Sequence, residues 1–305
     1  MTARLLVVGE ALVDVVTDAN GESAEHVGGS PANVAVGLAR LDHPVDFATW
    51  LGHDDRGERI AAHLRRHGVN LLEESFGPSP TSVAVATLDQ QGAATYDFDL
   101  HWDLPEVTLP EGTGHVHTGS IATVLQPGAQ SVTSVLRAVR EQGTVSYDPN
   151  IRPSIMGDLD AVRRRVEELV ALSDVVKASE DDLALLYPDE SPEQVMGRWV
   201  RLGAGLVVIT LGAEGVAYRV ASDERSERAP ARVKGVVDTV GAGDSFMAGL
   251  VSGLVVAGLL GDPGARQRLH DATLEEVGHA IERGLATSGV TVGRAGAYAP
   301  SLDEL

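Results

Sequence analysis

The chain has 305 residues, of which 43% are hydrophobic, and it contains no cysteine. This length can bury a large core, and the absence of cysteine excludes disulfide bonds and thiolate metal sites. Its net charge of −20, from 24 basic and 44 acidic side chains, argues against nucleic acid as a partner, because phosphates need a basic surface. We therefore expect a soluble enzyme with a main domain and a smaller appendage.

The chain begins with MTARLLVVGEALVDVV, a short apolar run that Glu10 and Asp14 interrupt. This segment lacks the small-residue cleavage pattern of a signal peptide, so we expect the protein in the cytoplasm. It predicts a first β-strand with Asp14 at its end. Because an open α/β sheet presents residues to a ligand at the carboxyl ends of its strands, Asp14 is a candidate binding residue.

Strand and helix patterns alternate along most of the chain. Apolar runs predict strands at Leu5–Val8, Val116–Thr118, Val145–Asp148, Asp174–Ala178 and Leu206–Leu211. Helical periodicity falls between them, at Ala32–Leu41, Glu58–His67, Ala129–Gln142, Asp160–Leu172 and Pro192–Leu202. This alternation predicts a parallel sheet covered by helices on both faces.

Two regions do not follow the alternation. Residues 15–27 form a polar excursion, and residues 70–102 alternate in strand fashion, with SVAVATL and ATYDFDL separated by Gln90-Gln91-Gly92. We expect these two regions to form a small β-sheet, a lid, at the mouth of the main domain. The main domain would comprise residues 1–14, 28–69 and 103–305.

The segment Asp238–Phe246, DTVGAGDSF, places two glycines and a carboxylate where an apolar helix begins. Unpaired N–H groups and the helix dipole favour an anion there, and glycines let it come close. A carboxylate beside an anion is repelled unless it has a chemical role, such as taking the proton of a hydroxyl that attacks a phosphoryl group. We predict a phosphotransfer site with Asp244 as the base, the alternative being that Asp244 only caps its helix.

The residues that follow, Ser245–Leu260, are almost all apolar. This run is shorter than the roughly 18–20 residues that cross a bilayer, and it lies between Asp244 and Asp262. We predict a helix buried in the protein rather than a membrane span, with Gly249 and Gly253 allowing close packing of its neighbours.

Other nucleotide-binding motifs are missing from the sequence. There is no G-x-x-x-x-G-K-[ST], and the first strand runs into Gly9–Leu12 (GEAL) rather than G-x-G-x-x-G. A P-loop enzyme is therefore excluded and a dinucleotide-binding fold disfavoured. His115 and His117 stand two apart on one strand and could suggest a metal pair, but with no third ligand in the pattern we favour strand packing.

Five motifs follow one another along the chain: Gly28–Asn33 (GGSPAN), Leu51–Gly57 (LGHDDRG), Tyr147–Arg152 (YDPNIR), Thr210–Gly215 (TLGAEG) and Asp238–Asp244 (DTVGAGD). In this order they resemble the ribokinase-like (PfkB) carbohydrate kinase family, and its fructokinase branch most of all. The resemblance covers essentially the whole chain. It implies a three-layer αβα ribokinase-like fold with a central, mostly parallel sheet and a β-sheet lid. It also implies a homodimer, because relatives pair such lids across a two-fold axis.

The resemblance implies an ATP-dependent sugar kinase, in agreement with the predicted phosphotransfer site. Asp244 would deprotonate the primary hydroxyl of the sugar, and the turn Gly241–Asp244, with the amides of Ala242, Gly243 and Asp244, would stabilise the transferred group. The sugar would contact Asp14, Gly28, Gly29, Asn33, Phe98 and Arg152. ATP would contact Lys177, Ser179, Thr210, Gly212, Gly215, Gly241, Gly243 and Ser288.

The resemblance further implies Mg²⁺ at the phosphates and K⁺ nearby. Carbonyls around Asp238 and Val240 resemble the family's monovalent-cation site. Near the Mg²⁺ position the family often carries N-x-x-E, where this chain has Ser179 and Asp182. Because Asp182 is one methylene shorter than Glu, Glu180 or a bridging water could take over its contact with Mg²⁺.

The lid narrows the choice of substrate. It carries acidic and aromatic side chains rather than basic ones: Tyr96, Asp97, Phe98, Asp99, His101, Trp102 and Asp103. A phosphorylated sugar would be repelled there, so we expect a free hexose, most of all D-fructose. One alternative is a 2-keto-3-deoxygluconate kinase, in which Arg152 would pair with the substrate carboxylate rather than tie down its own loop. A nucleoside kinase and a sugar sensor without turnover are further alternatives.

Overall fold

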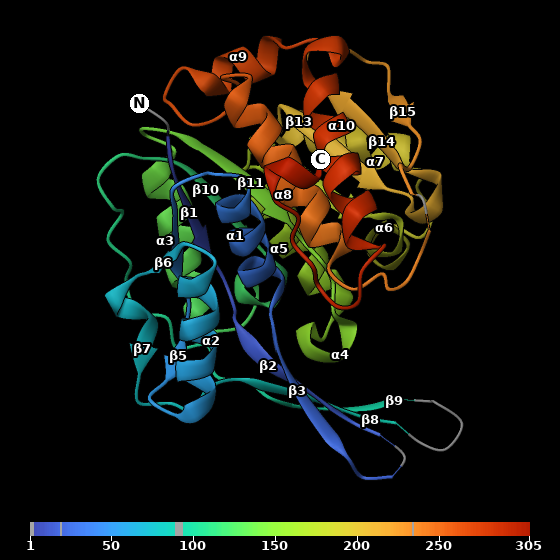
Figure 1. Ribbon diagram of the computed structural model, residues 1–305. Helices are drawn as coiled ribbons and strands as arrows, with labels where there is room; N and C mark the ends of the chain where they lie inside the picture. Colours follow the sequence, from blue (N-terminus) through green and yellow to red (C-terminus); the bar gives the residue numbers. More distant parts are fainter. Residues whose placement is uncertain (1–2, 19, 89–93, 234) are drawn as a thin grey trace.

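The computed structural model describes residues 3–18, 20–88, 94–233 and 235–305 (Figure 1). The predicted turn at Gln90-Gln91-Gly92 lies outside these residues. Within them, the main sheet has nine strands in the order β15-β14-β13-β12-β11-β10-β1-β4-β6. From β13 to β6, each strand in this order is parallel to the next one. The pairs β13–β14 and β14–β15 are antiparallel. Their bounds are β1 Arg4–Val8, β4 Val45–Ala48, β6 Val69–Leu71, β10 Thr113–Gly119, β11 Thr144–Asp148, β12 Val175–Ser179, β13 Leu206–Thr210, β14 Val216–Val220 and β15 Glu227–Ala229.

Alternate residues of the buried strands face two separate cores. In β1, Leu5 and Val7 belong to one core, and Leu6 and Val8 belong to the other. The first core is covered by α1 (Ser30–Arg40), α2 (Asp55–Arg66), α8 (Ala242–Val256), α9 (Ala265–Asp271) and α10 (Leu274–Thr291). The second is covered by α3 (Gly128–Val139), α4 (Pro153–Met156), α5 (Leu159–Val170), α6 (Glu180–Leu186) and α7 (Pro192–Leu202). The predicted three-layer arrangement is confirmed.

A second sheet of four strands, in the order β3-β2-β8-β9, extends away from the main domain (Figure 1). We call it the lid sheet; its strands are β2 (Leu12–Thr17), β3 (Ser23–Gly28), β8 (Val83–Leu88) and β9 (Ala94–Asp99). The predicted start of the lid at residue 15 is too late. The first strand ends at Val8, and Asp14 lies inside β2 rather than at the end of β1. Apolar residues on both sides of Gly9 hide the break between the two strands in the sequence.

Part of the predicted lid segment 70–102 belongs to other structures. β6 lies in the main sheet. Two short strands pair with each other outside both sheets, β5 (Leu51–Gly52) and β7 (Phe76–Gly77). Trp102 is buried, and its Nε1 donates a hydrogen bond to the carbonyl of Ala122 at 2.9 Å. Trp102 is therefore a core residue, and its prediction as a lid contact is wrong. The alternating pattern of the sequence cannot distinguish a lid strand from a segment that packs on the core.

The predicted apolar helix is α8, which packs against α1 and α10 (Figure 1). Its glycines permit this close approach: a Cβ on Gly253 would lie 2.6 Å from the Cα of Ala280, and one on Gly249 would lie 2.4 Å from Oγ1 of Thr287. In the part of the chain that the structure describes, no helix is long and apolar enough to span a membrane. The buried-helix interpretation of this segment is confirmed.

We expect Gly253→Ala to lower the free energy of unfolding by about 1–3 kcal/mol, because the added methyl group overpacks the α8–α10 contact. The control is Gly278→Ala in α10, where a Cβ meets nothing within 4 Å. This control should be neutral or stabilise by up to about 1 kcal/mol, since alanine favours helix. Urea unfolding measures both, and equal effects would show that close packing at Gly253 does not stabilise the fold.

Candidate active site

A cavity of about 720 Å³ lies where the strand ends of the main sheet, the start of α8 and the lid sheet meet. Ser179 and Thr210 come from the ends of β12 and β13, Asp14 and Phe98 from the lid sheet, and Asp244 from α8. Open α/β sheets bind ligands at this edge. The structure thus brings together most of the predicted site residues: Asp14, Gly29, Asn33, Phe98, Arg152, Lys177, Ser179, Asp182, Thr210, Val240, Gly241, Gly243 and Asp244.

Asp244 lies in the first turn of α8, and two side chains of α1 hold its carboxylate. Ser30 Oγ donates a hydrogen bond to Oδ1 at 2.6 Å, and Asn33 Nδ2 donates one to Oδ2 at 2.8 Å. The two donors fix the carboxylate toward the cavity at the positive end of a helix dipole. Sequence reasoning predicted Asn33 but missed Ser30, although Ser30 lies within the GGSPAN motif.

The start of α1 depends on Gly29, the residue before its first turn. Gly29 has φ +106°, and a Cβ there would lie 2.5 Å from the backbone oxygen of Glu10. Only glycine tolerates both the backbone angle and this approach. Gly29 therefore brings Ser30 and Asn33 within reach of Asp244.

The start of α8 is the turn that the sequence predicts to bind an anion. Gly241 has φ +74°, and a Cβ there would lie 2.6 Å from the Cβ of Ala297. The amide of Ala242 donates to the carbonyl of Thr239 at 3.2 Å, so the turn closes on itself before the helix begins. The amides of Gly243 and Asp244 follow at the positive end of the helix, where a phosphoryl group would be stabilised.

Lys177 adds a full positive charge to this turn. Its Nζ lies 3.0 Å from the position that a Cβ on Gly243 would occupy, and it donates to Oδ2 of Asp148 at 2.8 Å. Burial acts to lower the pKa of Lys177, but the carboxylates of Asp148, Asp182 and Asp244 outweigh it and hold the pKa above its usual range. The ammonium therefore stays charged beside the anion-binding turn.

A second cavity, of about 450 Å³, joins the first at Thr210, Thr239 and Gly243. It contains the predicted nucleotide residues Gly212, Gly215 and Ser288, and Ala242 of the predicted catalytic turn. Its other walls are largely apolar and include Val216, Val233, Val236, Phe246, Leu285 and Val292. An apolar pocket that opens onto an anion-binding turn fits a nucleoside whose phosphates reach the first cavity.

The opposite side of the first cavity carries the predicted sugar contacts. Burial raises the pKa of Asp14, an effect that His26 opposes. Gly28 lies directly behind Asp14, because a Cβ on Gly28 would lie 1.9 Å from Oδ2 of Asp14. Arg152 faces the cavity, and its Nη1 donates to its neighbour's carbonyl, Ile151 O, at 3.0 Å. Arg152 thus supports its own loop while remaining available to a ligand.

Residues 2–304 match the model of the pfkB family of carbohydrate kinases. The chain belongs to this family. A fructokinase of Klebsiella pneumoniae is 34% identical over 269 residues, which are 85% of this chain and 87% of the relative. A double mutant of Vibrio cholerae O395 fructokinase, solved with fructose, ADP and a potassium ion, has a TM-score of 0.82 at 26% identity and covers 99% of this chain and 96% of its own. Aminoimidazole riboside kinase of Salmonella enterica, solved with aminoimidazole riboside and an ATP analogue, has a TM-score of 0.80 at 27% identity and covers 99% and 98%.

These matches confirm the predicted family and the ribokinase-like fold of this carbohydrate kinase.

Glu10 is a residue of the kinase site that sequence reasoning missed. It is buried in the first cavity, and its Oε2 accepts a hydrogen bond from the amide of Ala122 at 3.2 Å. Burial raises the pKa of Glu10 to about 8, and the charge of Asp244 adds to the effect. The signal was its position directly after β1, at the binding edge of the sheet.

We expect Glu10→Gln to change how stability depends on pH. Between about pH 4.5 and 8 the folded kinase keeps a proton that the unfolded chain releases, so ionisable Glu10 costs stability as pH rises through this window. The free energy of unfolding of the variant, relative to that of the wild type, should therefore increase between pH 4.5 and 8, by at most about 5 kcal/mol. Urea unfolding at several pH values measures the difference, and parallel curves for the two proteins would contradict the raised pKa.

The two residues predicted at the Mg²⁺ site behave differently in the structure. Asp182 Oδ1 accepts from the amide of Ile151 at 2.7 Å, and Oδ2 accepts from the amide and Oγ of Ser179 at 2.8 and 2.7 Å. Asp182 therefore caps α6 and anchors the loop before α4, although it also lines the first cavity. Glu180 is not among the residues that line either cavity.

The carboxylate of Asp238 joins two loops beside the site. It accepts hydrogen bonds from the amide of Val240 at 3.0 Å and from the amide of Gly296 at 2.9 Å. Both bonds lower the pKa of Asp238. The carbonyls predicted to bind K⁺ therefore belong to a turn that the loop around Gly296 holds in place.

His115 and His117 form a buried polar ladder between β10 and β11. His115 shares hydrogen bonds with Thr144 Oγ1 and Ser146 Oγ, and His117 shares one with the same Ser146 Oγ, each at 2.9 Å. Among the described residues, no group of three His, Asp or Glu side chains could hold a metal ion. The two imidazole rings therefore have hydroxyl groups as hydrogen-bond partners, as expected for side chains that pack within the sheet.

Proposed function

We propose that the protein is an ATP-dependent fructokinase, which transfers the γ-phosphate of ATP to a primary hydroxyl of D-fructose. The observation that carries this proposal is the position of Asp244, at the start of α8, where the sugar-side cavity joins the nucleotide cavity. The relatives that are named fructokinases support fructose as the substrate. A free sugar also fits the acidic lid sheet.

In the proposed reaction, Asp244 accepts the proton of the sugar hydroxyl as that oxygen attacks phosphorus. Each oxygen of Asp244 accepts one hydrogen bond, from Ser30 or Asn33, and has a second lone pair free for a bond from the substrate. The amides of Gly243 and Asp244 and the ammonium of Lys177 then stabilise the charge on the transferred phosphoryl group. Asp14 and Asn33 would orient the sugar through its other hydroxyls.

We further propose that Mg²⁺ accompanies ATP and that K⁺ lies at the carbonyls of Asp238 and Val240. Mg²⁺ keeps several waters and is held mainly by the phosphates in such sites. The three hydrogen bonds that occupy Asp182 fit a water-mediated contact better than direct ligation. When bound, Mg²⁺ would neutralise part of the phosphate charge.

Two alternative substrates each have an observation in their favour. Arg152 in the cavity would pair with the carboxylate of 2-keto-3-deoxygluconate. Tyr96 and Phe98 line the cavity with parallel rings, 6.1 Å between centroids, and could stack with a nucleoside base. A sugar sensor without turnover is the remaining alternative.

A coupled ADP-release assay with ATP, Mg²⁺ and K⁺ tests the proposal. The panel contains fructose, ribose, glucose, 2-keto-3-deoxygluconate, fructose 6-phosphate and adenosine. We expect turnover with fructose well above every other compound. Faster turnover of another compound would replace fructose by that substrate, and sugar binding without any ADP release would identify a sensor.

We also propose a cytoplasmic homodimer. The use of ATP favours the cytoplasm, where that nucleotide is abundant. β3 and β9 are edge strands of the lid sheet, and Tyr96 on β9 is 62% exposed. Pairing of two lid sheets would cover such edges. Light scattering should give twice the chain mass, and a single-chain mass at all concentrations would refute the dimer.

A further inference from the structure

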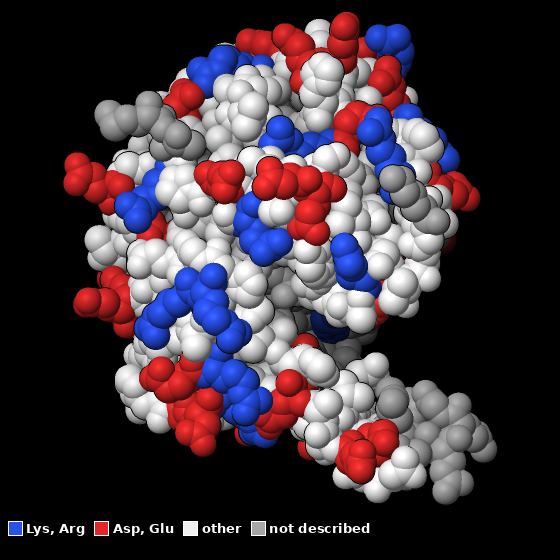
Figure 2. Space-filling model, in the orientation of Figure 1, with Lys and Arg blue, Asp and Glu red and all other residues white. Residues whose placement is uncertain are grey.

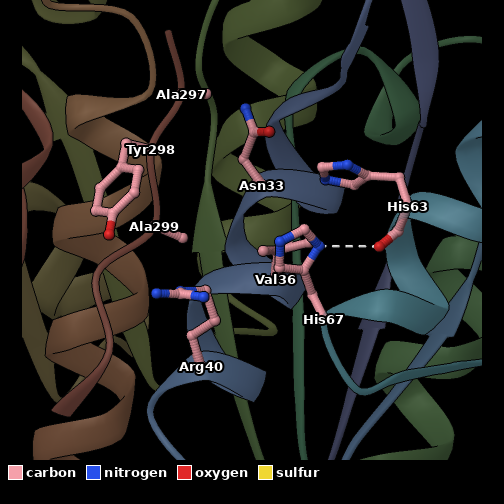
Figure 3. A pocket seen from close by; sticks show the side chains of 8 residues that line it. All are labelled: Asn33, Val36, Arg40, His63, His67, Ala297, Tyr298 and Ala299. Carbon is pink, nitrogen blue, oxygen red and sulfur yellow. Dashed lines mark hydrogen bonds between the residues drawn. The ribbon is translucent and has the colours of Figure 1, made fainter. Parts of the chain in front are cut away.

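A third, smaller cavity lies behind the sugar side of the active site. It measures about 180 Å³ and lies between α1, α2 and the segment 297–299 near the end of the chain (Figure 3). Its walls are Asn33, Val36, Arg40, His63, His67, Ala297, Tyr298 and Ala299. This space is too small for a nucleotide but can hold a group of phosphate size.

The side chains of this cavity that can carry a positive charge are one arginine and two histidines. Arg40, His63 and His67 line it, and none of its described lining residues is Asp or Glu. Arg59 and Arg66 line an adjoining cleft, which also includes His63. Figure 2 shows Lys and Arg side chains gathered over α2. Such a cluster is notable in a chain with a net charge of −20.

The basic groups lie close enough to repel one another. The ring centroids of His63 and His67 are 4.5 Å apart. Burial, together with the charges of His67 and Arg66, lowers the pKa of His63 to about 4. Nδ1 of His67 donates to the carbonyl of His63 at 2.9 Å (Figure 3). A bound anion would favour the protonated form of the rings and accept a hydrogen bond from each of them.

Arg40 has unused donor capacity at the cavity. Its Nε is buried and has no hydrogen-bond partner among the described residues. One terminal nitrogen pairs with Glu304 at 3.3 Å, and the guanidinium lies 5.7 Å from the centre of the Tyr298 ring. Guanidinium groups bind phosphate through two parallel hydrogen bonds. Arg40 is therefore held in place with donors to spare.

We propose that this cavity binds the phosphate group of a small ligand, either inorganic phosphate or a phosphate monoester. The Arg40 guanidinium and the two imidazoles supply the donors, and the small volume limits the ligand to one phosphate with a short organic part. The site differs from the anion-binding turn of α8, which would hold the phosphates of ATP. Its existence does not depend on which sugar the kinase uses.

Two walls of the cavity also support the active site. Asn33 donates a hydrogen bond to Asp244, and Ala297 packs against Gly241 at the start of α8. A phosphate that tightens the contact between α2 and the segment 297–299 therefore acts on the residues that position the base. We expect phosphate to change the affinity for the sugar, and by thermodynamic reciprocity the sugar to change the affinity for phosphate by the same factor.

Isothermal titration calorimetry of the full chain tests the site. Inorganic phosphate and glycerol 3-phosphate are titrated separately, with and without a saturating non-hydrolysable ATP analogue that fills the turn at α8. Binding should persist with the analogue and weaken by about 10- to 100-fold in Arg40→Gln and in His63→Gln. The control Arg65→Gln removes the same charge from an exposed position of α2 and should bind normally. Tighter binding of glycerol 3-phosphate would support a monoester as ligand, and equal or weaker binding would support free phosphate.

A further variant gives a gain that misfolding cannot imitate. In Glu304→Gln the remaining oxygen can still accept from the amide of Ser301, the new amide nitrogen can donate to Tyr298 Oη, and the charge that competes for Arg40 is removed. The variant should bind phosphate several-fold more tightly than the wild type. The proposal is overturned if neither ligand binds the wild type while the analogue is present, or if Arg40→Gln and His63→Gln bind as well as Arg65→Gln.

Discussion

Replacing Asp244 with asparagine should lower kcat by about 10²- to 10⁴-fold, the contribution of a general base, and change the KM for fructose little. Asparagine has the shape of aspartate and can still accept a hydrogen bond from Ser30 Oγ. Its NH2 group can donate to Asn33 once the Asn33 amide turns its oxygen toward it, so α1 and α8 should keep their positions. It cannot take up the proton of the attacking hydroxyl. The loss should therefore appear in the chemical step, measured as steady-state and single-turnover rates of ADP formation.

The matched control is Asp55→Asn, which removes a carboxylate from the first turn of α2. Asp55 is exposed and lines none of the cavities. The control should keep normal rates, because both variants lose a favourable charge at a helix start but only one loses the base. If Asp244→Asn kept more than a tenth of the wild-type kcat, Asp244 would be a capping residue and the base would lie elsewhere.

The motifs of this chain led to a candidate site because they record backbone constraints that only certain residues satisfy. Gly241 and Gly29 both have positive φ, and a Cβ on either would collide with a neighbouring segment. A glycine-rich string before an apolar helix therefore predicted a turn and its anion hole without knowledge of the fold. The alternation of apolar runs predicted the layers for a similar reason, because period and burial are coupled.

Contacts between distant segments could not be predicted in the same way. Asn33 and Asp244 are separated by 211 positions and meet only because α1 and α8 pack on the same face of the sheet. The burial of Glu10 depends equally on residues far along the chain, such as Ala122.

The start of α10 shows a local signal that the sequence analysis missed. Thr273 and Glu276 form a capping box, and their spacing is visible in the sequence.

Replacing Lys177 with methionine should lower the free energy of unfolding by about 3–5 kcal/mol, because it leaves a buried carboxylate without its counter-ion. Lys177 is 4% exposed and Asp148 is 1% exposed. Asp148 Oδ2 accepts from Lys177, and Oδ1 is buried without a hydrogen-bond partner among the described residues. Urea unfolding of the variant measures the loss.

A double-mutant cycle separates the ion pair from packing. Asp148→Asn together with Lys177→Met removes both charges, and it should recover much of the stability that Lys177→Met loses. Activity should not recover with it, because the ammonium beside Gly243 is still absent and the KM for ATP should stay high. If the double variant were as unstable as Lys177→Met, the lost packing of the lysine stem would explain the effect, and Asp148 would not need the charge of Lys177. Recovery of stability without recovery of activity would show that one buried lysine both neutralises Asp148 and serves the phosphates.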